Sequence, residues 1–117
     1  MKTRTRYVPA AGELVWLTFD PTAGHEQAGR RPALVLSPIE YNRLTGLALM
    51  CPITSRVKGY SFEVPLPPGL PVSGVVLADQ VKNLDWRQRQ VVRIALAPPS
   101  LHASVYQRLD KLLEPGN

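Results

Sequence analysis

The sequence contains few of the residues from which most enzyme active sites are built. Its 117 residues include one cysteine and two histidines (Cys51, His25 and His102), and these are not spaced as a set of zinc ligands. It also lacks the glycine-rich loop that cradles nucleotide phosphates and the turn that presents a nucleophilic serine in hydrolases. These absences exclude a disulfide within the chain, and we expect neither a metal nor another cofactor.

Long apolar runs are missing as well. No stretch approaches the length of a membrane span, and the basic N-terminus MKTRTRYVPAAG has no apolar segment of the kind found in signal peptides. The lone Cys51 lies in the apolar run LALMCPI, which indicates a buried structural thiol in a reducing compartment. We therefore expect a cytoplasmic protein that does not interact with membranes.

The chain instead has a globular composition with an excess of positive charge. Apolar residues make up 44% and charged residues 20% of the sequence, and the net charge is +5. The length and composition predict a single domain, residues 1–117. The charge favours an anionic partner, which can be a nucleic acid or an acidic protein segment.

Short apolar runs between turn signals predict a small β-rich fold. Strands are expected at 13–19, 32–38, 47–53, 61–66, 74–81 and 90–97, with a charged turn KNLDWRQR between the last two. In the run 61–66 the side chains of Phe62, Val64 and Leu66 alternate with those of polar or proline residues, which is typical of a half-buried strand near an edge. The segment 65–74, rich in proline and glycine, is expected to be a surface loop.

Two helices are expected beside these strands. Ser37 as N-cap and Pro38 at the first helical position predict a short helix that ends at Gly46. A C-terminal amphipathic helix is predicted by the helical spacing of Leu101, Val105, Leu109, Leu112 and Leu113. Together the elements predict a strongly curved antiparallel sheet or barrel with helices on its outside.

The segment EQAGRRP, residues 26–32, is the best candidate for a functional site. Arg31 stands at the start of a predicted strand, and its guanidinium beside the Glu26 carboxylate suits a phosphodiester. RNA supplies its own nucleophile, the 2′-hydroxyl, so such a site needs to orient it, accept its proton and stabilise the transition state. Thr54, at the end of the third predicted strand, can add a hydroxyl hydrogen bond. On the residues alone a structural alternative stays open, in which Glu26 pairs with Arg30 and Thr54 is a polar strand end.

Four blocks of the sequence point to a known family. They are RYVPAAGELVWLTFDPTAGHEQAGRRPALVLSP, YNRLTGLALMCPITS, KGYSFEV and GVVLADQVKNLDWR. In order, spacing and length the chain resembles the MazF/PemK toxins of bacterial toxin–antitoxin modules over nearly its whole length. The resemblance implies a mainly β fold with α, namely the SH3-like small barrel of CcdB/MazF-like toxins with a C-terminal helix and short additional helices. It also implies a homodimer.

The resemblance further implies a sequence-specific, metal-independent endoribonuclease that inhibits translation and growth. Its substrate is expected to be single-stranded RNA, in particular messenger RNA, cut to leave 2′,3′-cyclic phosphate and 5′-hydroxyl ends. A cognate acidic, MazE-like antitoxin is expected to cover the RNA groove.

The family's functional residues fall on matching positions of this chain. Arg31 matches the essential arginine, Thr54 the essential threonine and Glu26 a loop glutamate that supports activity. Because a guanidinium rarely releases a proton, we expect Arg31 to clamp the phosphate and Glu26 to act as the base. Further RNA contacts are expected from Arg30, Arg56, Lys58, Gln80 and Lys82.

The two tryptophans are expected to pack rather than to bind RNA. Trp16 lies within a predicted strand and is assigned to the core, while Trp86 is assigned to packing or to the dimer surface. Base stacking is the weaker alternative for both.

Two other functions remain as rivals. A related fold serves toxins that bind DNA gyrase and cut nothing, although that mode of action does not require Glu26, Arg31 and Thr54 together. A single-stranded RNA-binding module is the second rival, and it would leave RNA intact.

Overall fold

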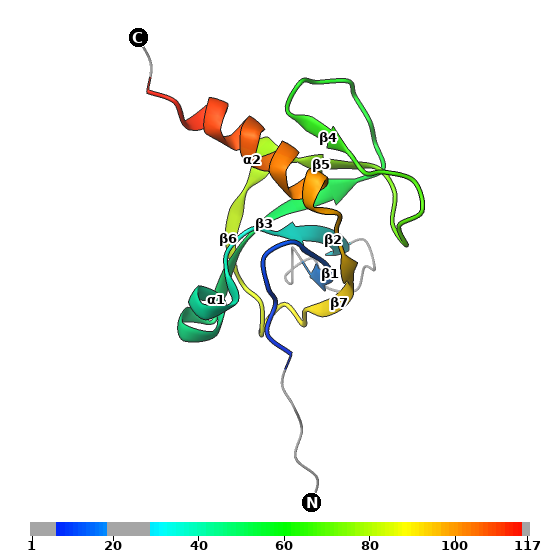
Figure 1. The fold of residues 1–117 in the computed structure, drawn as a ribbon. Helices are drawn as coiled ribbons and strands as arrows, with labels where there is room; N and C mark the ends of the chain where they lie inside the picture. Colours follow the sequence, from blue (N-terminus) through cyan, green and yellow to red (C-terminus); the bar gives the residue numbers. More distant parts are fainter. Residues whose placement is uncertain (1–6, 19–28, 116–117) are drawn as a thin grey trace, which may run out of the picture.

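The computed structural model describes residues 7–18 and 29–115, which form a curved antiparallel sheet with helices beside it (Figure 1). The strands are β1 (Glu13–Thr18), β2 (Arg30–Val35), β3 (Leu47–Thr54), β4 (Glu63–Pro65), β5 (Val75–Leu77), β6 (Lys82–Asp85) and β7 (Val92–Leu96). The helices are α1 (Ile39–Thr45), the short 3₁₀ helix η3 (Ala78–Gln80) and α2 (Pro99–Leu113). The expected fold class, mainly β with a C-terminal helix and a short additional helix, is confirmed.

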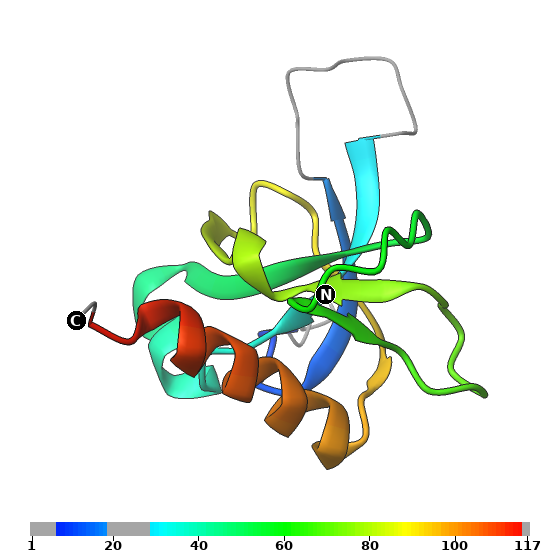
Figure 2. The ribbon, with the colours of Figure 1, turned by 90° about the horizontal axis from the view of Figure 1, so that it is seen from above.

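The strands follow one another in the order β4-β5-β3-β2-β1-β7. The long strand β3 has two partners on the same side of the chain, β6 along its first half and β5 at its end, so the sheet bends sharply along β3. Within the described residues the pairings do not join β4 to β7, so the expected small barrel is an open, strongly curved sheet. Figures 1 and 2 show α2 lying along one side of this sheet.

The curvature gives the sheet two separate apolar cores. Alternation along β1 divides its side chains between them, because Leu14 faces one core while Val15 and Leu17 face the other. The first core lies under α2 and includes Leu34, Cys51, Val76 and Val105, and the second is filled by Val35, Met50 and Trp86 among others. The helical spacing predicted for α2 is confirmed by the burial of Leu101, Val105 and Leu109.

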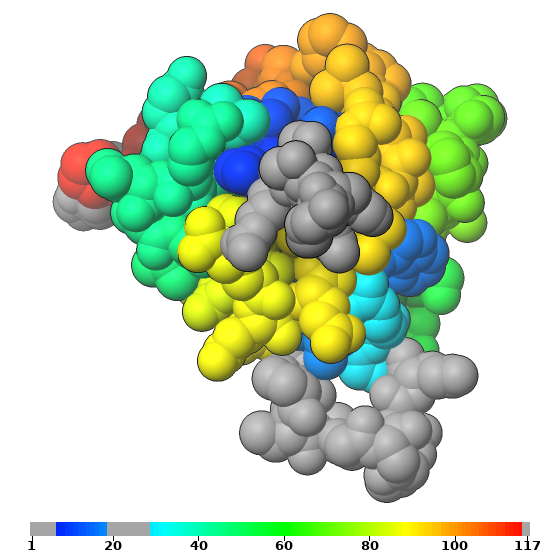
Figure 3. Space-filling model, turned by 90° about the horizontal axis from the view of Figure 1, so that it is seen from below, coloured from blue at the N-terminus to red at the C-terminus, as the bar shows by residue number. Residues whose placement is uncertain are grey.

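Several local predictions are confirmed. Gly46 ends α1 in a left-handed conformation with φ of 75°, which glycine adopts without steric cost. Cys51 is fully buried, and burial raises the pKa of its thiol to about 12. Trp86 packs in the second core, and its Nε1–H donates to the carbonyl of Asn42 at 3.0 Å. Through this contact α1 and the segment 82–90 lie together on one face of the molecule (Figure 3).

Other predictions are wrong for reasons that involve distant parts of the chain. The first half of the predicted charged turn, KNLD, is strand β6, because Leu84 pairs with Ala48 of β3 and is buried. The predicted strand 74–81 ends early and turns into η3.

The helix predictions need two corrections. Pro38, not Ser37, is the N-cap of α1, since the Ser37 hydroxyl instead donates to the Asn42 side chain at 2.5 Å. Leu112 and Leu113 are 51% and 76% exposed, so the apolar stripe of α2 is covered only as far as Leu109.

The prediction that Trp16 lies in the core is also wrong, because its side chain is 37% exposed. No helix in the described ranges is both long and apolar enough to span a membrane.

Candidate active site

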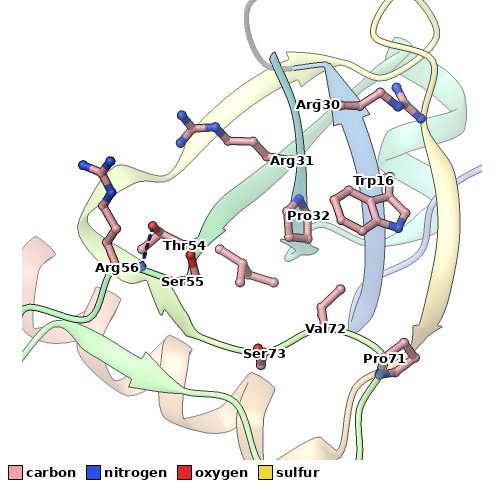
Figure 4. Close-up of a pocket in the computed structure, with 11 residues that line it drawn as sticks. Trp16, Arg30, Arg31, Pro32, Thr54, Ser55, Arg56, Pro71, Val72 and Ser73 are labelled. Atoms are coloured by element: carbon pink, nitrogen blue, oxygen red, sulfur yellow. Dashed lines mark hydrogen bonds between the residues drawn. The ribbon is translucent and has the colours of Figure 1, made fainter. Parts of the chain in front are cut away.

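A cavity of about 700 Å³ lies where β2 begins and β3 ends (Figure 4). Its lining comes from four segments: Trp16 of β1, Arg30 to Pro32 of β2, Ile53 to Arg56 at the end of β3, and Pro71 to Ser73 from the loop between β4 and β5. In the antiparallel register of β2 and β3, Ala33 faces Pro52 and Leu34 faces Cys51. Continuing this register by two residues places Arg31 across from Thr54. Both residues line this cavity, so the ends of β2 and β3 bring together the two residues that the sequence marks as functional.

The Thr54 side chain is held in a defined position. Its Oγ1 accepts a hydrogen bond from the backbone N–H of Arg56 at 3.1 Å. A hydroxyl that accepts one hydrogen bond still carries its own hydrogen, which it can donate to an anionic oxygen. The backbone bend after β3 therefore orients Thr54 as a donor at the cavity.

Gly74 holds the backbone of Thr54 from the other side. Its φ is 121°, and a Cβ at this position would lie 2.2 Å from the Thr54 carbonyl oxygen, far inside van der Waals contact. The Gly74 carbonyl also accepts the N–H of Leu66 at 2.9 Å, which closes the loop 65–74 at its base. The absence of a side chain at residue 74 thus lets this loop, with its cavity wall of Pro71 to Ser73, pack directly on Thr54.

The cationic groups divide into two kinds. Arg31 and Arg56 are exposed, and Figure 4 shows them with Thr54 at one end of the cavity and Trp16 at the other. The Arg30 guanidinium is turned toward the 86–90 turn, where it donates to the carbonyls of Arg89 and Gln90 and to the Thr18 hydroxyl. Arg31 and Arg56 therefore supply the positive charge beside Thr54, while Arg30 ties β2 to the turn.

A smaller cavity of about 180 Å³ adjoins the first and shares Thr54 and Arg56 with it. It adds Lys58 and Gln80, two of the residues expected to contact RNA. Four residues expected at the site therefore lie along one continuous surface with Arg31: Thr54, Arg56, Lys58 and Gln80. Lys82 does not line either cavity, because it lies on β6 opposite Met50. Glu26 lies outside the described residues, as does His25.

Glu63 is a residue of this surface that the sequence did not indicate. Its position in the alternating run 61–66 predicted a polar, outward side chain, yet it is only 6% exposed. Its carboxylate accepts the backbone N–H groups of Lys58 and Gly59 at 3.1 and 2.9 Å. The buried carboxylate therefore fixes the loop that carries Lys58. The hint in the sequence is Gly59, four residues before Glu63, because glycine suits a tight turn; in the structure its φ is 86°.

A second electrostatic cluster ties β1 to β7. Burial alone would raise the pKa of the Glu13 carboxyl, but hydrogen bonds from Tyr7, Ala10 and Arg93 outweigh burial and hold this pKa below its ordinary value. The Arg93 Nε–H donates to Glu13 at 2.9 Å. Burial, followed by the hydrogen bond to Glu13, raises the pKa of Tyr7. None of the three side chains lines the cavity at Thr54, so we assign them to stability.

The parts of the chain that the structure describes contain no group of three or more histidine, cysteine, aspartate or glutamate side chains arranged to hold a metal ion.

Comparisons with known proteins identify the family and the fold. A sequence profile of the PemK-like, MazF-like toxins of type II toxin–antitoxin systems matches residues 10–113. The endoribonuclease toxin MazF of Escherichia coli K12 is 53% identical over 95 residues, which are 81% of this chain and 85% of that protein. The crystal structure of MazF from Deinococcus radiodurans has a TM-score of 0.85 and 61% identity, covering 92% of this chain and 98% of that one.

A crystal structure of the MazE–MazF complex from the same organism has a TM-score of 0.84 and 54% identity, covering 95% of this chain and all of that one. Because the profile matches residues 10–113 and the Escherichia coli MazF is 53% identical over most of both chains, this chain belongs to the PemK-like, MazF-like toxin family of type II toxin–antitoxin systems.

Proposed function

We propose that this protein is a metal-independent endoribonuclease toxin that cuts single-stranded RNA at a specific sequence, with messenger RNA as its substrate in the cell. The observation that carries the proposal is the placement of Arg31 and Thr54 on adjacent strand ends in one open cavity. A guanidinium and a hydroxyl donor side by side can bind the oxygens of a single phosphodiester. The family and the net charge of +5 support the same substrate class.

In this reaction the 2′-oxygen attacks the neighbouring phosphorus while the bond from phosphorus to the 5′-oxygen breaks. One proton leaves the 2′-hydroxyl and one proton reaches the 5′-oxygen, so the products are a 2′,3′-cyclic phosphate and a 5′-hydroxyl. Negative charge builds up on the non-bridging oxygens as the phosphorane forms. Arg31 stabilises this charge through its paired N–H groups, and Thr54 donates its hydroxyl hydrogen to one of the same oxygens.

Glu26 is assigned to proton transfer. The arginine of the site is a poor base, because a guanidinium stays protonated at any physiological pH. A carboxylate within reach of the 2′-hydroxyl can accept its proton. Glu26 stands five residues before Arg31 in the sequence and is the carboxylate we assign to this role.

The rest of the surface is assigned to RNA binding. Arg56, Lys58 and Gln80 extend the surface away from Arg31 and are placed to follow the RNA backbone. We assign two further cations to phosphates farther along the RNA strand: Arg30, which is held at the 86–90 turn, and Lys82 of β6. A cationic surface of this kind also suits the acidic segment of a cognate antitoxin. A partner of this kind is supported by the similar MazF structure, which was determined in complex with MazE.

We also propose that the protein is cytoplasmic and that it forms a homodimer. An apolar groove of about 890 Å³ between α1, β3 and α2 offers the surface for a second copy. Leu49 and Tyr106 are exposed at this groove as part of one apolar surface, and contiguous apolar surfaces of this kind mark sites of protein association.

The test is cleavage of a long, weakly folded RNA by the purified protein in excess EDTA, with the Arg31→Ala variant as control. Both ends of the products are mapped. We expect cuts at a short recurring sequence, cyclic phosphate ends and no cuts by the variant. Intact RNA from folded protein would contradict the proposal. If that RNA is bound but uncut, the RNA-binding rival is supported, and if it is not bound, the gyrase-binding rival is next to test.

A further inference from the structure

Trp16 is placed where a core residue is not expected. On β1 its neighbours Val15 and Leu17 are fully buried, while the Trp16 side chain is 37% exposed and lines the cavity at Thr54. The side chains around it in that lining are apolar: Pro32, Ile53, Pro71 and Val72. One end of the cavity is therefore an aromatic and aliphatic surface that remains open.

The other end of the same cavity has the opposite chemistry. There Arg31 and Arg56 bring positive charge next to the Thr54 hydroxyl (Figure 4). A nucleotide has the same division into two parts, because a flat apolar base is joined through its sugar to a charged phosphate. Aromatic side chains in single-strand binding sites stack on bases, and cationic side chains bind the phosphates between them.

We propose that Trp16 is the stacking platform of a nucleobase-binding subsite, which holds the base of a nucleotide adjacent to the phosphate bound by Arg31 and Thr54. The proposal rests on the proposed function and adds a site to it. A cavity of about 700 Å³ is within the size range of pockets that enclose small organic ligands. Stacking contributes affinity and positions the nucleotide, and it discriminates weakly between bases because every base has a flat face.

The backbone around Trp16 is rigid, as a stacking platform requires. Its strand is hydrogen-bonded on both sides, with Pro32 of β2 and Val92 of β7 as cross-strand neighbours. The buried side chains before and after it anchor β1 in the second core. Little conformational entropy is therefore lost when a base packs against the ring.

An acidic protein segment is the competing occupant, since its carboxylates can also meet the two arginines. The flat indole favours a nucleobase, because two flat faces bury more area against each other than a ring and a flexible acidic side chain do. The experiment below includes the protein segment as an outcome that overturns the proposal.

The test measures binding of an oligodeoxynucleotide, chosen as the tightest binder among short probes of varied sequence, which lacks the 2′-hydroxyl and stays intact. In a series of probes, one position at a time is replaced by an abasic deoxyribose. The chain has two tryptophans, and Trp86 is 2% exposed with its N–H bonded to Asn42, so Trp16 is the residue whose fluorescence a stacked base can quench. The Trp86→Phe variant leaves Trp16 as the sole reporter.

We expect the full probe to quench the fluorescence of both wild type and Trp86→Phe. One abasic position should abolish the quenching and weaken binding about tenfold. Trp16→Leu should bind the full probe about tenfold more weakly and lose no further affinity at that abasic position, while Trp16→Phe, which keeps a ring, stays within about threefold of wild type. Val92→Ala, an exposed neighbour that does not line this cavity, is the matched control and should bind normally.

The proposal is overturned if Trp16→Leu, shown to be folded by its thermal unfolding, binds every probe as wild type does. It is also overturned if Trp16→Leu keeps nucleic-acid binding but loses affinity for an acidic antitoxin peptide, since Trp16 is then a protein contact. Because the probes are never cleaved, these results do not depend on catalysis. A wild type that binds probes with base-dependent quenching but leaves RNA intact contradicts the proposed function and not the subsite.

Discussion

The cavity at Thr54 and the apolar groove beside α2 are similar in size and opposite in chemistry. The cavity is lined by arginines, hydroxyls and a tryptophan, whereas the groove is lined mainly by Leu36, Pro38, Tyr41, Leu49, Tyr106, Leu109 and Leu113. They have no lining residue in common. Size alone does not identify a reactive site. The positively charged donors of the cavity suit an anionic substrate. The scarcity of such donors in the groove suits association with another protein surface.

The two surfaces also differ in how they are built. The groove is formed largely by side chains of the regular elements α1, β3 and α2, with Leu36 to Pro38 and Val81 from the connecting segments. The cavity is formed where regular elements end, from the first residues of β2, the last residues of β3 and the loop before β5. Strand ends leave backbone groups and side chains free to meet a ligand, which suits catalysis on a rigid sheet. Three predictions test this division of roles and a fourth concerns a cluster outside both surfaces, in order of expected effect.

Removing Arg31 should have the largest effect on activity. We expect Arg31→Ala to lower single-turnover RNA cleavage about 10³-fold, because the growing charge on the phosphorane loses its main donor. The residue is exposed, so the variant should stay folded, which its thermal unfolding checks. Cleavage within tenfold of wild type would show that Arg31 does not contact the transition state.

Gly74→Ala should reduce cleavage through Thr54. The new methyl group meets the Thr54 carbonyl, and a shift of about 1 Å in a catalytic group costs about 100-fold in rate. Gly69→Ala is the matched control: it lies in the same loop with φ of 95°, but nothing lies within 4 Å of its added Cβ. Both variants carry the strain of a positive φ, so both should lose stability, and only Gly74→Ala should lose cleavage. Equal rates for the two would mean that the loop does not position Thr54.

Changing the groove should alter assembly. We expect Leu49→Lys to convert a dimer to a monomer in sedimentation experiments, because a charge in an apolar interface is buried without a partner. Arg31→Ala should remain dimeric in the same experiment. A wild type that sediments as a monomer at all concentrations would remove the groove from the dimer proposal. A dimeric Leu49→Lys would place the interface elsewhere.

The smallest effect concerns the Glu13 cluster, which belongs to neither surface. The pKa of Glu13 is lowered in the folded state, so its ionised form stabilises the fold above its ordinary pKa of 4.5, and this stabilisation is lost as the pH falls through the folded pKa. Urea unfolding should therefore show Glu13→Gln less stable than wild type by about 1 kcal/mol at pH 7, with the difference shrinking below pH 4.5. A difference that stays constant down to pH 3 would contradict the role of the carboxylate. RNA cleavage should be unchanged at pH 7.

Local chemistry in the sequence was sufficient for most elements and for the central residues of the site. The apolar runs of β1, β2 and β3 and the left-handed Gly46 follow from side-chain alternation and backbone sterics, which act over a few residues. Arg31 at a strand start and Thr54 at a strand end were recognisable for the same reason, and the family resemblance added their roles. Each of these features depends on neighbours close in sequence.

The tertiary structure alone decided what depends on distant neighbours. KNLD became strand β6 because β3 offered an unpaired edge, and Glu63 became buried because the N–H groups of Lys58 and Gly59 turn toward it. Trp16 is exposed because it lines the open cavity, and a side chain at residue 74 has no room because the backbone of Thr54 lies against it. Pattern and propensity report on one segment at a time. Pairing, burial and close approach arise between segments far apart in the chain, so only the packed structure contains them.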